Sequence, residues 1–210
     1  MCAHDFFELI GERLRNYYGF ARVFAVCKCV YCGGEEVLGT TEMQYTRNKN
    51  DKRLPLLKIK SLNKNMLTLS QRVPNGATKI GKTNRTLAEV GCTITCVAMS
   101  SSYFGEYKTN KELASALRFT ADAKILWGSI GEVFKRFEFR WRFYSNDRQF
   151  ISEAIKNPDK TVLLNVDHGG HWVLAIRRLY GDTYWVCDPW SGTRKIYSGV
   201  VGGAVLVRKR

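Results

Sequence analysis

The chain has 210 residues, of which 45% are hydrophobic, 12% aromatic and 25% charged. This composition excludes a globally disordered chain and predicts a buried core, in one domain with an appendage or in two small domains. The 33 Lys and Arg residues against 19 Asp and Glu residues give a formal net charge of +14, which favours acidic partners such as nucleic acid, an anionic polymer or a membrane surface.

The beginning of the chain does not have the pattern of a targeting segment. Residues 1–14 carry three acidic side chains and no basic start, so we expect no signal peptide. We also expect no transmembrane segment, because no apolar run approaches the roughly 20 residues that span a bilayer. The seven cysteines are odd in number and lack the spacing of a disulfide framework. Reduced thiols in a cytoplasm are therefore expected.

The first third of the sequence predicts a small module. Apolar residues recur at helical spacing over residues 5–18, and Gly19 is placed to end a short amphipathic helix. Residues 20–31 and 37–43 predict two strands of a hairpin joined by a glycine turn. A polar, charged linker without periodicity follows over residues 45–53.

Cys27, Cys29 and Cys32 lie close together at the end of the first strand of this hairpin. Zinc requires four ligands, and a Cys-x-x-Cys pair supplies two of them. Cys2 and His4 are the nearby residues that could complete such a site. Residues 7–37 are weakly similar to small zinc-ribbon-like modules of phage proteins but lack their later cysteine pair. Two interpretations stay open, a degenerate zinc ribbon and a metal-free hairpin with packed or idle thiols, and we expect the second, with no bound cofactor.

The second part of the sequence predicts helices followed by an antiparallel sheet. Residues 54–62 predict one more strand, and we place the domain boundary near residue 65, giving a helix-plus-hairpin module over 1–65 and a larger domain over 66–210. Beyond the boundary, an extended segment over 67–72 leads to predicted helices over residues 92–104, 110–119, 129–137 and 147–156. Strands are predicted over residues 161–166, 172–178, 183–187, 195–198 and 204–208. This order predicts an α+β fold.

Cys92 is the predicted nucleophile of this domain. A thiol nucleophile needs a lowered pKa, a base within reach and a group that orients the base. Cys92 follows Gly91 at the start of an apolar helix, where the helix dipole favours the thiolate. The rival is Cys96, one turn further along the same face, for which a small buried apolar role is expected.

His171 is the predicted general base, and Asp188 the residue that orients it. His171 begins a predicted strand after two glycines, whereas its rival His168 lies in the preceding turn. Asp188 ends the next strand of the hairpin, and hairpin geometry returns it to the neighbourhood of His171, as the third member of a catalytic triad requires. The alternative is that Asp188 only begins an Asp-Pro turn.

Three short motifs occur in the order found in one family of cysteine peptidases. They are Gly91-Cys92 with Ala98-Met99 and Tyr103-Phe104-Gly105, then Gly170-His171-Trp172-Val173, then Val186-Cys187-Asp188-Pro189-Trp190-Ser191-Gly192. Over about residues 66–208 the chain resembles the double-glycine-leader-peptidase-like group of papain-fold cysteine peptidases. The resemblance implies a papain-like fold, with its helical half before its sheet. It also implies that Gln71 is the counterpart of the glutamine that helps to form the family's oxyanion hole. The residues after Gln71 depart from the family pattern, and a surface-exposed Gln71 is the alternative.

The resemblance implies a stand-alone hydrolase of the kind found in bacteria and phages. The expected substrate is a protein or peptide, including the peptide stem of peptidoglycan, and the expected location is the cytoplasm of a bacterial host, or the virion if a phage encodes the chain. The rival is a non-catalytic papain-like scaffold that uses the charge of +14 to bind nucleic acid or protein. Because the basic residues are spread along the chain, an ordinary solvated surface is the default explanation of that charge. The sequence gives no oligomeric state.

Overall fold

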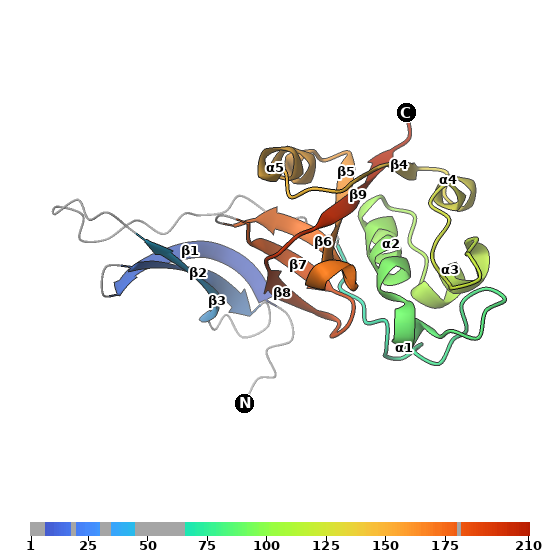
Figure 1. Ribbon diagram of the computed structural model, residues 1–210, viewed down its shortest axis with the longest axis horizontal. Helices are drawn as coiled ribbons and strands as arrows, with labels where there is room; N and C mark the ends of the chain where they lie inside the picture. Colours follow the sequence, from blue (N-terminus) through green and yellow to red (C-terminus); the bar gives the residue numbers. More distant parts are fainter. Residues whose placement is uncertain (1–6, 18–19, 30–34, 45–65, 180–181) are drawn as a thin grey trace. The chain divides into compact units, whose positions relative to one another are not determined.

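The chain consists of two structural units, Met1–Lys64 and Asn65–Arg210. The structure is a computed structural model that describes residues 7–17, 20–29, 35–44, 66–179 and 182–210, with side chains described in the last two ranges. Figure 1 traces the two units along the chain.

The first unit contains an antiparallel sheet with the strand order β1-β2-β3. These strands are β1 (Phe7–Tyr17), β2 (Phe20–Cys29) and β3 (Glu35–Gln44). The two strands predicted as a hairpin are confirmed in β2 and β3. Cys27 and Cys29 fall in β2 without described side chains, and Cys32 falls outside the described residues, as does the strand predicted over 54–62. The zinc interpretation therefore stays a prediction.

The helix predicted over residues 5–18 is wrong, because this segment forms β1. Its pairing with β2 is antiparallel and runs from Phe7 opposite Cys29 to Tyr17 opposite Phe20. Only two residues separate β1 from β2, which is rich in Val and Phe, so the two segments are neighbours in the chain and can pair directly. Pairing along almost the whole length satisfies the backbone N–H and C=O groups of both strands. This pairing with the next strand outweighs the weak helical preference that the apolar spacing indicated.

The second unit begins with helices that sequence periodicity largely predicted. They are α1 (Leu87–Val90), α2 (Cys92–Tyr103), α3 (Asn110–Ala116), α4 (Ser129–Val133) and, later in the chain, α5 (Arg148–Lys156). Thr109 caps α3 by accepting a hydrogen bond from the backbone N–H of Glu112, and Asp147 caps α5 by accepting one from that of Phe150. Both caps satisfy N–H groups that have no acceptor within the helix.

Parts of this helical region differ from the prediction. The helix α1 was not predicted, and α3 ends at Ala116 instead of residue 119. The helix predicted over 129–137 is shorter, because α4 ends at Val133 and the strand β4 (Phe137–Phe143) follows. This segment alternates bulky aromatic residues with charged ones, which is the period of a strand and not of a helix. The extended segment predicted over 67–72 carries no assigned strand, although Gln71 N–H donates to Pro189 C=O at 2.7 Å.

A six-stranded antiparallel sheet forms the rest of the second unit, in the order β4-β9-β5-β6-β7-β8. Besides β4, its strands are β5 (Lys160–Val166), β6 (His171–Arg178), β7 (Tyr184–Asp188), β8 (Thr193–Tyr197) and β9 (Gly202–Arg208). The five predicted strands are confirmed with shifts of one or two residues at their ends. The α+β class is confirmed, although β4 precedes α5 and the helices are therefore not all first in the chain.

The two faces of this sheet bury different apolar residues. Along β5, Leu163 packs into the core that contains α2, whereas Val162 and Leu164 pack with Ile151 of α5. Successive side chains of a strand point to opposite faces, so one strand serves both cores. Figure 1 shows α1 to α4 on one side of the sheet and α5 on the other. The start of α2 is thereby held against the sheet near β6.

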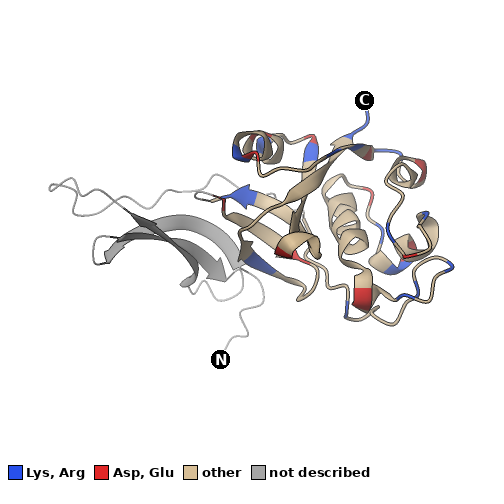
Figure 2. Cartoon of the chain, in the orientation of Figure 1, with Lys and Arg blue, Asp and Glu red and all other residues tan. Residues whose placement is uncertain are grey.

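Surface charge in the second unit is dispersed. Figure 2 shows basic residues over loops, helices and strand ends instead of on one element. None of the helices in the described part of the chain is long and apolar enough to cross a membrane.

Candidate active site

Cys92 is the first residue of the buried helix α2. The preceding Gly91 lies between α1 and α2, and a Cβ atom added there would lie 2.5 Å from the carbonyl oxygen of Leu87. Only glycine therefore allows α1 to end so close to the start of α2. The half-buried Cys92 thiol lies at the positive end of the α2 dipole.

Burial and hydrogen bonding act in opposite directions on the Cys92 thiol. Burial by itself would raise its pKa, but a hydrogen bond with His171, a hydrogen bond from the backbone N–H of Trp172 and the positive charge of His171 outweigh it. The pKa of Cys92 is therefore lowered from its ordinary value. This is the direction that a nucleophilic or otherwise reactive cysteine needs.

The other two cysteines of the second unit differ from Cys92 in burial and in the direction of their pKa shift. Cys96 and Cys187 are fully buried, and burial raises the pKa of both thiols. The Cys96 thiol donates to the carbonyl oxygen of Trp172 at 3.5 Å. A buried neutral thiol is a poor nucleophile, and Cys96 therefore has the packing role expected for it.

His171 enters the site from the first position of β6. It follows the turn Asp167–Gly169, in which Gly169 adopts a φ of 96° that favours glycine. The ring atom Nε2 of His171 lies 2.7 Å from Oδ1 of Asp188, which leaves Nδ1 as the ring atom for Cys92. The rival His168 is exposed in the turn.

The pKa of His171 is raised to about 9. Burial by itself would lower this pKa, but hydrogen bonds to Asp188 and Cys92, together with the negative charges of both groups, outweigh it. Protonated His171 and ionised Cys92 stabilise each other, so the two groups titrate as a coupled pair.

Asp188 is completely buried at the end of β7. Its Oδ1 accepts from His171 and from the backbone N–H of Trp190, whereas Oδ2 accepts from the hydroxyl of Ser191 and pairs with Nζ of Lys195 at 3.0 Å. Burial would raise the pKa of this carboxyl, but these donors outweigh it and lower the pKa well below its usual range. Asp188 also opens the predicted Asp-Pro turn, so the two interpretations of this residue are compatible.

Gln71 is buried rather than exposed, and it lines the same cleft as Cys92 and His171. Its Nε2 donates to the carbonyl oxygens of Leu87 and Ala88 at 3.2 and 3.1 Å. In the described part of the chain, Oε1 of Gln71 is buried without a hydrogen-bond partner. An oxyanion role therefore requires one of these bonds to α1 to open.

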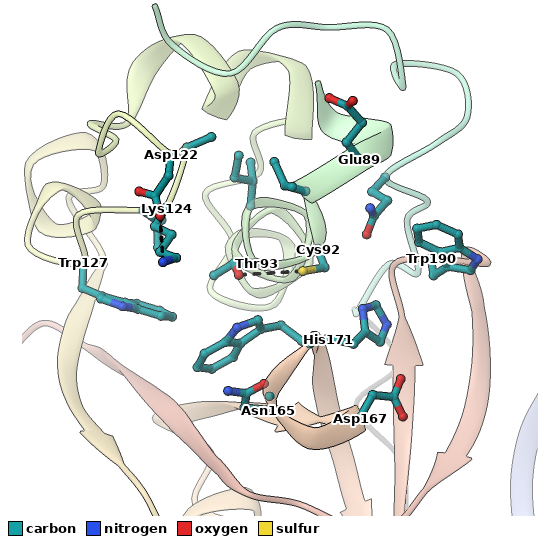
Figure 3. A pocket seen from close by; sticks show the side chains of 18 of the residues that line it. Glu89, Cys92, Thr93, Asp122, Lys124, Trp127, Asn165, Asp167, His171 and Trp190 are labelled. Atoms are coloured by element: carbon teal, nitrogen blue, oxygen red, sulfur yellow. Dashed lines mark hydrogen bonds and ion pairs between the residues drawn. The ribbon is translucent and has the colours of Figure 1, made fainter. Parts of the chain in front are cut away.

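A cleft of about 750 Å³ runs between the helices and the sheet, and both Cys92 and His171 line it. Figure 3 shows Glu89 and Trp190 on one side of Cys92, and Trp127, Lys124 and Asp122 on the other. The cleft thus extends beyond the reactive thiol in two directions. Its length and open form suit an extended chain better than a small enclosed ligand.

Four further polar or aromatic residues of this region were not anticipated from sequence. Trp127, Arg142 and Asn165 line the cleft, and Lys195 pairs with Asp188. The alternation in residues 137–143 could have indicated that Arg142 lies on a strand. Nothing local in the sequence links Asn165 or Trp127 to Cys92, because the sheet order brings Asn165 there and the packing of the turn before α4 brings Trp127.

No family model matches the sequence, and no curated protein has a significantly similar one.

Proposed function

We propose that the second unit is a cysteine hydrolase of papain-like fold that cleaves a peptide, isopeptide or related amide bond. The observation that carries this proposal is the arrangement of Cys92, His171 and Asp188. The pKa of the Cys92 thiol is lowered by an imidazole, and one ring nitrogen of that imidazole is held by a buried carboxylate. The thiol and the imidazole both border one long cleft.

The reaction begins with attack of the Cys92 thiolate on the substrate carbonyl carbon. A C–S bond forms, and the carbonyl electron pair moves onto oxygen to give a tetrahedral oxyanion. When the C–N bond breaks, the proton on Nδ1 of His171 passes to the departing amine. Neutral His171 then takes a proton from water, which attacks the thioester, and the released acid leaves the Cys92 thiolate and protonated His171 as before.

The backbone N–H of Cys92 is one donor for the oxyanion. It lies at the first position of α2, where N–H groups have no acceptor within the helix and the dipole favours negative charge. Gln71 is the proposed second donor, once Nε2 exchanges a carbonyl of α1 for the oxyanion. Each such donor contributes about 10²–10³ in rate in enzymes of this chemistry.

Asp188 acts through His171 and not on the substrate. Its contact with Nε2 fixes the ring so that Nδ1 faces Cys92, and its negative charge keeps the ring protonated. Protein and peptide chains, including the peptide stem of peptidoglycan, are the proposed substrates.

The test is the pH dependence of iodoacetamide labelling of Cys92, located by mass spectrometry, in the wild type and in His171→Ala. We expect rapid labelling of Cys92 near pH 6 in the wild type. Labelling should be roughly 100-fold slower in His171→Ala, whose thiol returns toward an ordinary pKa of about 8.5. The seven cysteines make site-resolved detection necessary.

Equal labelling of the two proteins, rising only toward pH 8.5, would contradict the proposal. It would favour the non-catalytic scaffold instead, in which the basic surface binds an acidic partner. Salt-sensitive binding that is unchanged in Cys92→Ala would support that alternative.

A further inference from the structure

We propose that the part of the cleft around Arg142 binds a carboxylate of the substrate, so that the hydrolase prefers peptides with an acidic residue near the bond that is cleaved. This inference rests on the proposed function. It is carried by four neighbouring residues that line the cleft, Trp127, Arg142, Asn165 and Trp172.

A β-bulge turns the Arg142 side chain into the cleft. Earlier in β4, Phe137 and Phe139 pack with the core under α2, and regular alternation would send Trp141 to the same face. The pairing of β4 with β9 shifts between Phe139 and Trp141, however, and Trp141 instead contacts Phe150 of α5. Arg142 is thereby placed on the cleft side, which is a common use of bulges near binding sites.

Three aromatic rings lie close to the Arg142 guanidinium. Its Cζ lies 5.3 Å from the ring centre of Trp172, 4.9 Å from that of Tyr144 and 6.0 Å from that of Trp127. Aromatic rings at these distances attract the cation but offer its N–H groups no conventional hydrogen-bond acceptor. In the described part of the chain, Nε of Arg142 is buried without a hydrogen-bond partner.

A buried guanidinium N–H without an acceptor costs free energy, and a ligand that supplies an acceptor recovers it. A carboxylate fits best, because its two oxygens match the fork of N–H groups and its charge is opposite. A neutral amide would supply one acceptor and no charge.

Asn165 indicates that the ligand also carries a hydrogen-bond donor beside its carboxylate. It pairs with Trp172 across β5 and β6. Its Oδ1 is likewise buried with no hydrogen-bond partner among the described residues. A peptide N–H would satisfy this acceptor. A carboxylate for Arg142 and an N–H for Asn165, both beside Trp172, are the features of an acidic residue within a peptide.

The two sides of the cleft differ in charge. Figure 3 shows Glu89 on the side of Trp190, and Lys124 on the side of Trp127. Lys124 is already paired with Asp122 at 2.7 Å and is 80% exposed, so Arg142 is the cation of that side that best fits a ligand. An acidic substrate residue is repelled by Glu89 and attracted by Arg142, which favours one direction of binding.

Trp172 joins this subsite to the reactive thiol. Its backbone N–H is hydrogen-bonded to Cys92, while its ring stacks on Arg142. The carboxylate is therefore expected within a few residues of the substrate carbonyl that Cys92 attacks.

The test uses affinity labels that differ in one carboxylate. N-iodoacetyl-glutamate amide and N-iodoacetyl-glutamine amide, with zero, one or two glycines as spacer, alkylate Cys92 by forming a C–S bond and releasing iodide. The rate of each label on the full chain is divided by the iodoacetamide rate of the same variant, which removes any change in thiol reactivity. For the best spacer, we expect the glutamate label to be about tenfold faster than the glutamine label in the wild type, as for a charge-assisted hydrogen bond.

Substitutions of Arg142 decide whether it causes that preference. In Arg142→Gln the ratio should fall to about one, and Arg142→Lys, which keeps the charge but loses the stacked planar fork, should give an intermediate ratio. The matched control is Lys124→Gln, which removes another cation of the cleft and should leave the preference in place. A wild-type ratio below about two with every spacer, or a ratio that survives in Arg142→Gln, would overturn the inference.

These outcomes are separable from failure of the proposed function. Slow labelling by iodoacetamide at pH 6 would count against the hydrolase. The ratio of the two labels is therefore also measured at pH 8.5, where an ordinary thiol is partly ionised, so that the carboxylate subsite is tested in either case.

Discussion

The helical wall and the sheet wall of the cleft contribute to the candidate site in different ways. The helical wall supplies one reactive atom, the sulfur of Cys92, and the start of α2 sets its position. The sheet wall supplies His171 and the buried Asp188, each held by further side-chain and backbone contacts. The helical wall thus fixes where the sulfur lies, whereas the sheet wall supplies the groups that lower its pKa and the network that holds them.

This difference predicts different sensitivities to substitution. A change at the start of α2 either removes the reactive atom or moves it. A change in the sheet network shifts a pKa by a graded amount, because several donors share the charge of Asp188.

Replacement of the reactive atom should have the largest effect. Cys92→Ala should remove the rapid phase of iodoacetamide labelling at pH 6 and lower the rate at least about 100-fold, because an ordinary thiol is about 0.3% ionised at that pH. The matched control is Cys96→Ala, which should keep the rapid phase and lose about 1–2 kcal/mol of stability from a small buried void. Rapid labelling that persists in Cys92→Ala and disappears in Cys96→Ala would reverse the assignment.

Crowding at the start of α2 should have the next largest effect. Gly91→Ala should lower the free energy of unfolding by about 1–3 kcal/mol, because the new Cβ would overlap the Leu87 carbonyl. It should also slow labelling of Cys92. Chemical denaturation measures the first effect. Gly128→Ala is the control, since a Cβ there meets nothing within 4 Å, and a loss as large as that of Gly91→Ala would contradict the packing argument.

Removal of the charge on the sheet wall should shift a pKa without removing a reactive atom. In Asp188→Asn the pKa of His171, about 9 in the wild type, should fall by about one to two units, because the carboxylate that favours the imidazolium is gone. NMR titration of the ring follows this pKa, helped by the presence of only three histidines. Ser191→Ala, which removes one donor to Asp188 and keeps its charge, should change the His171 pKa by a fraction of a unit.

The pKa of His171 also determines whether the free energy of unfolding rises or falls with pH. The raised pKa of His171 contributes stability below its unfolded pKa of about 6.5, and this contribution is lost as the pH rises from about 6.5 through about 9. The decline should be smaller in Asp188→Asn. An equal decline in both proteins would show that Asp188 does not raise the pKa of His171.

The smallest change in the His171 pKa is expected from substitution of Lys195, which contacts the same carboxylate, Asp188, as His171 does. Lys195→Gln should raise the pKa of His171 by less than about half a unit, because one competing positive charge leaves the carboxylate. The shift is small because the Lys195 side chain is 44% exposed and its charge is screened by water and salt. The same NMR titration measures it, and a fall of the His171 pKa in Lys195→Gln would contradict this sharing.

The sequence determined the local features of the second unit. The start of α2 at Cys92, the starts of α3 and α5 and most strands of the sheet follow from apolar period and capping residues, which act over a few positions. The pairing of His171 with Asp188 was also predictable, because one hairpin joins them. For β1 the same local reasoning was wrong, since pairing with β2 outweighed helical spacing.

Only the tertiary structure decided what lies around these residues. The order of the sheet brings Asn165 beside Trp172, and a bulge in β4 turns Arg142 into the cleft. Burial raises the pKa of the Cys96 thiol, whereas His171 and the backbone of Trp172 outweigh burial at Cys92 and lower its pKa. Such features depend on contacts between residues far apart in the chain. Apolar period and capping residues are local patterns and do not predict those contacts.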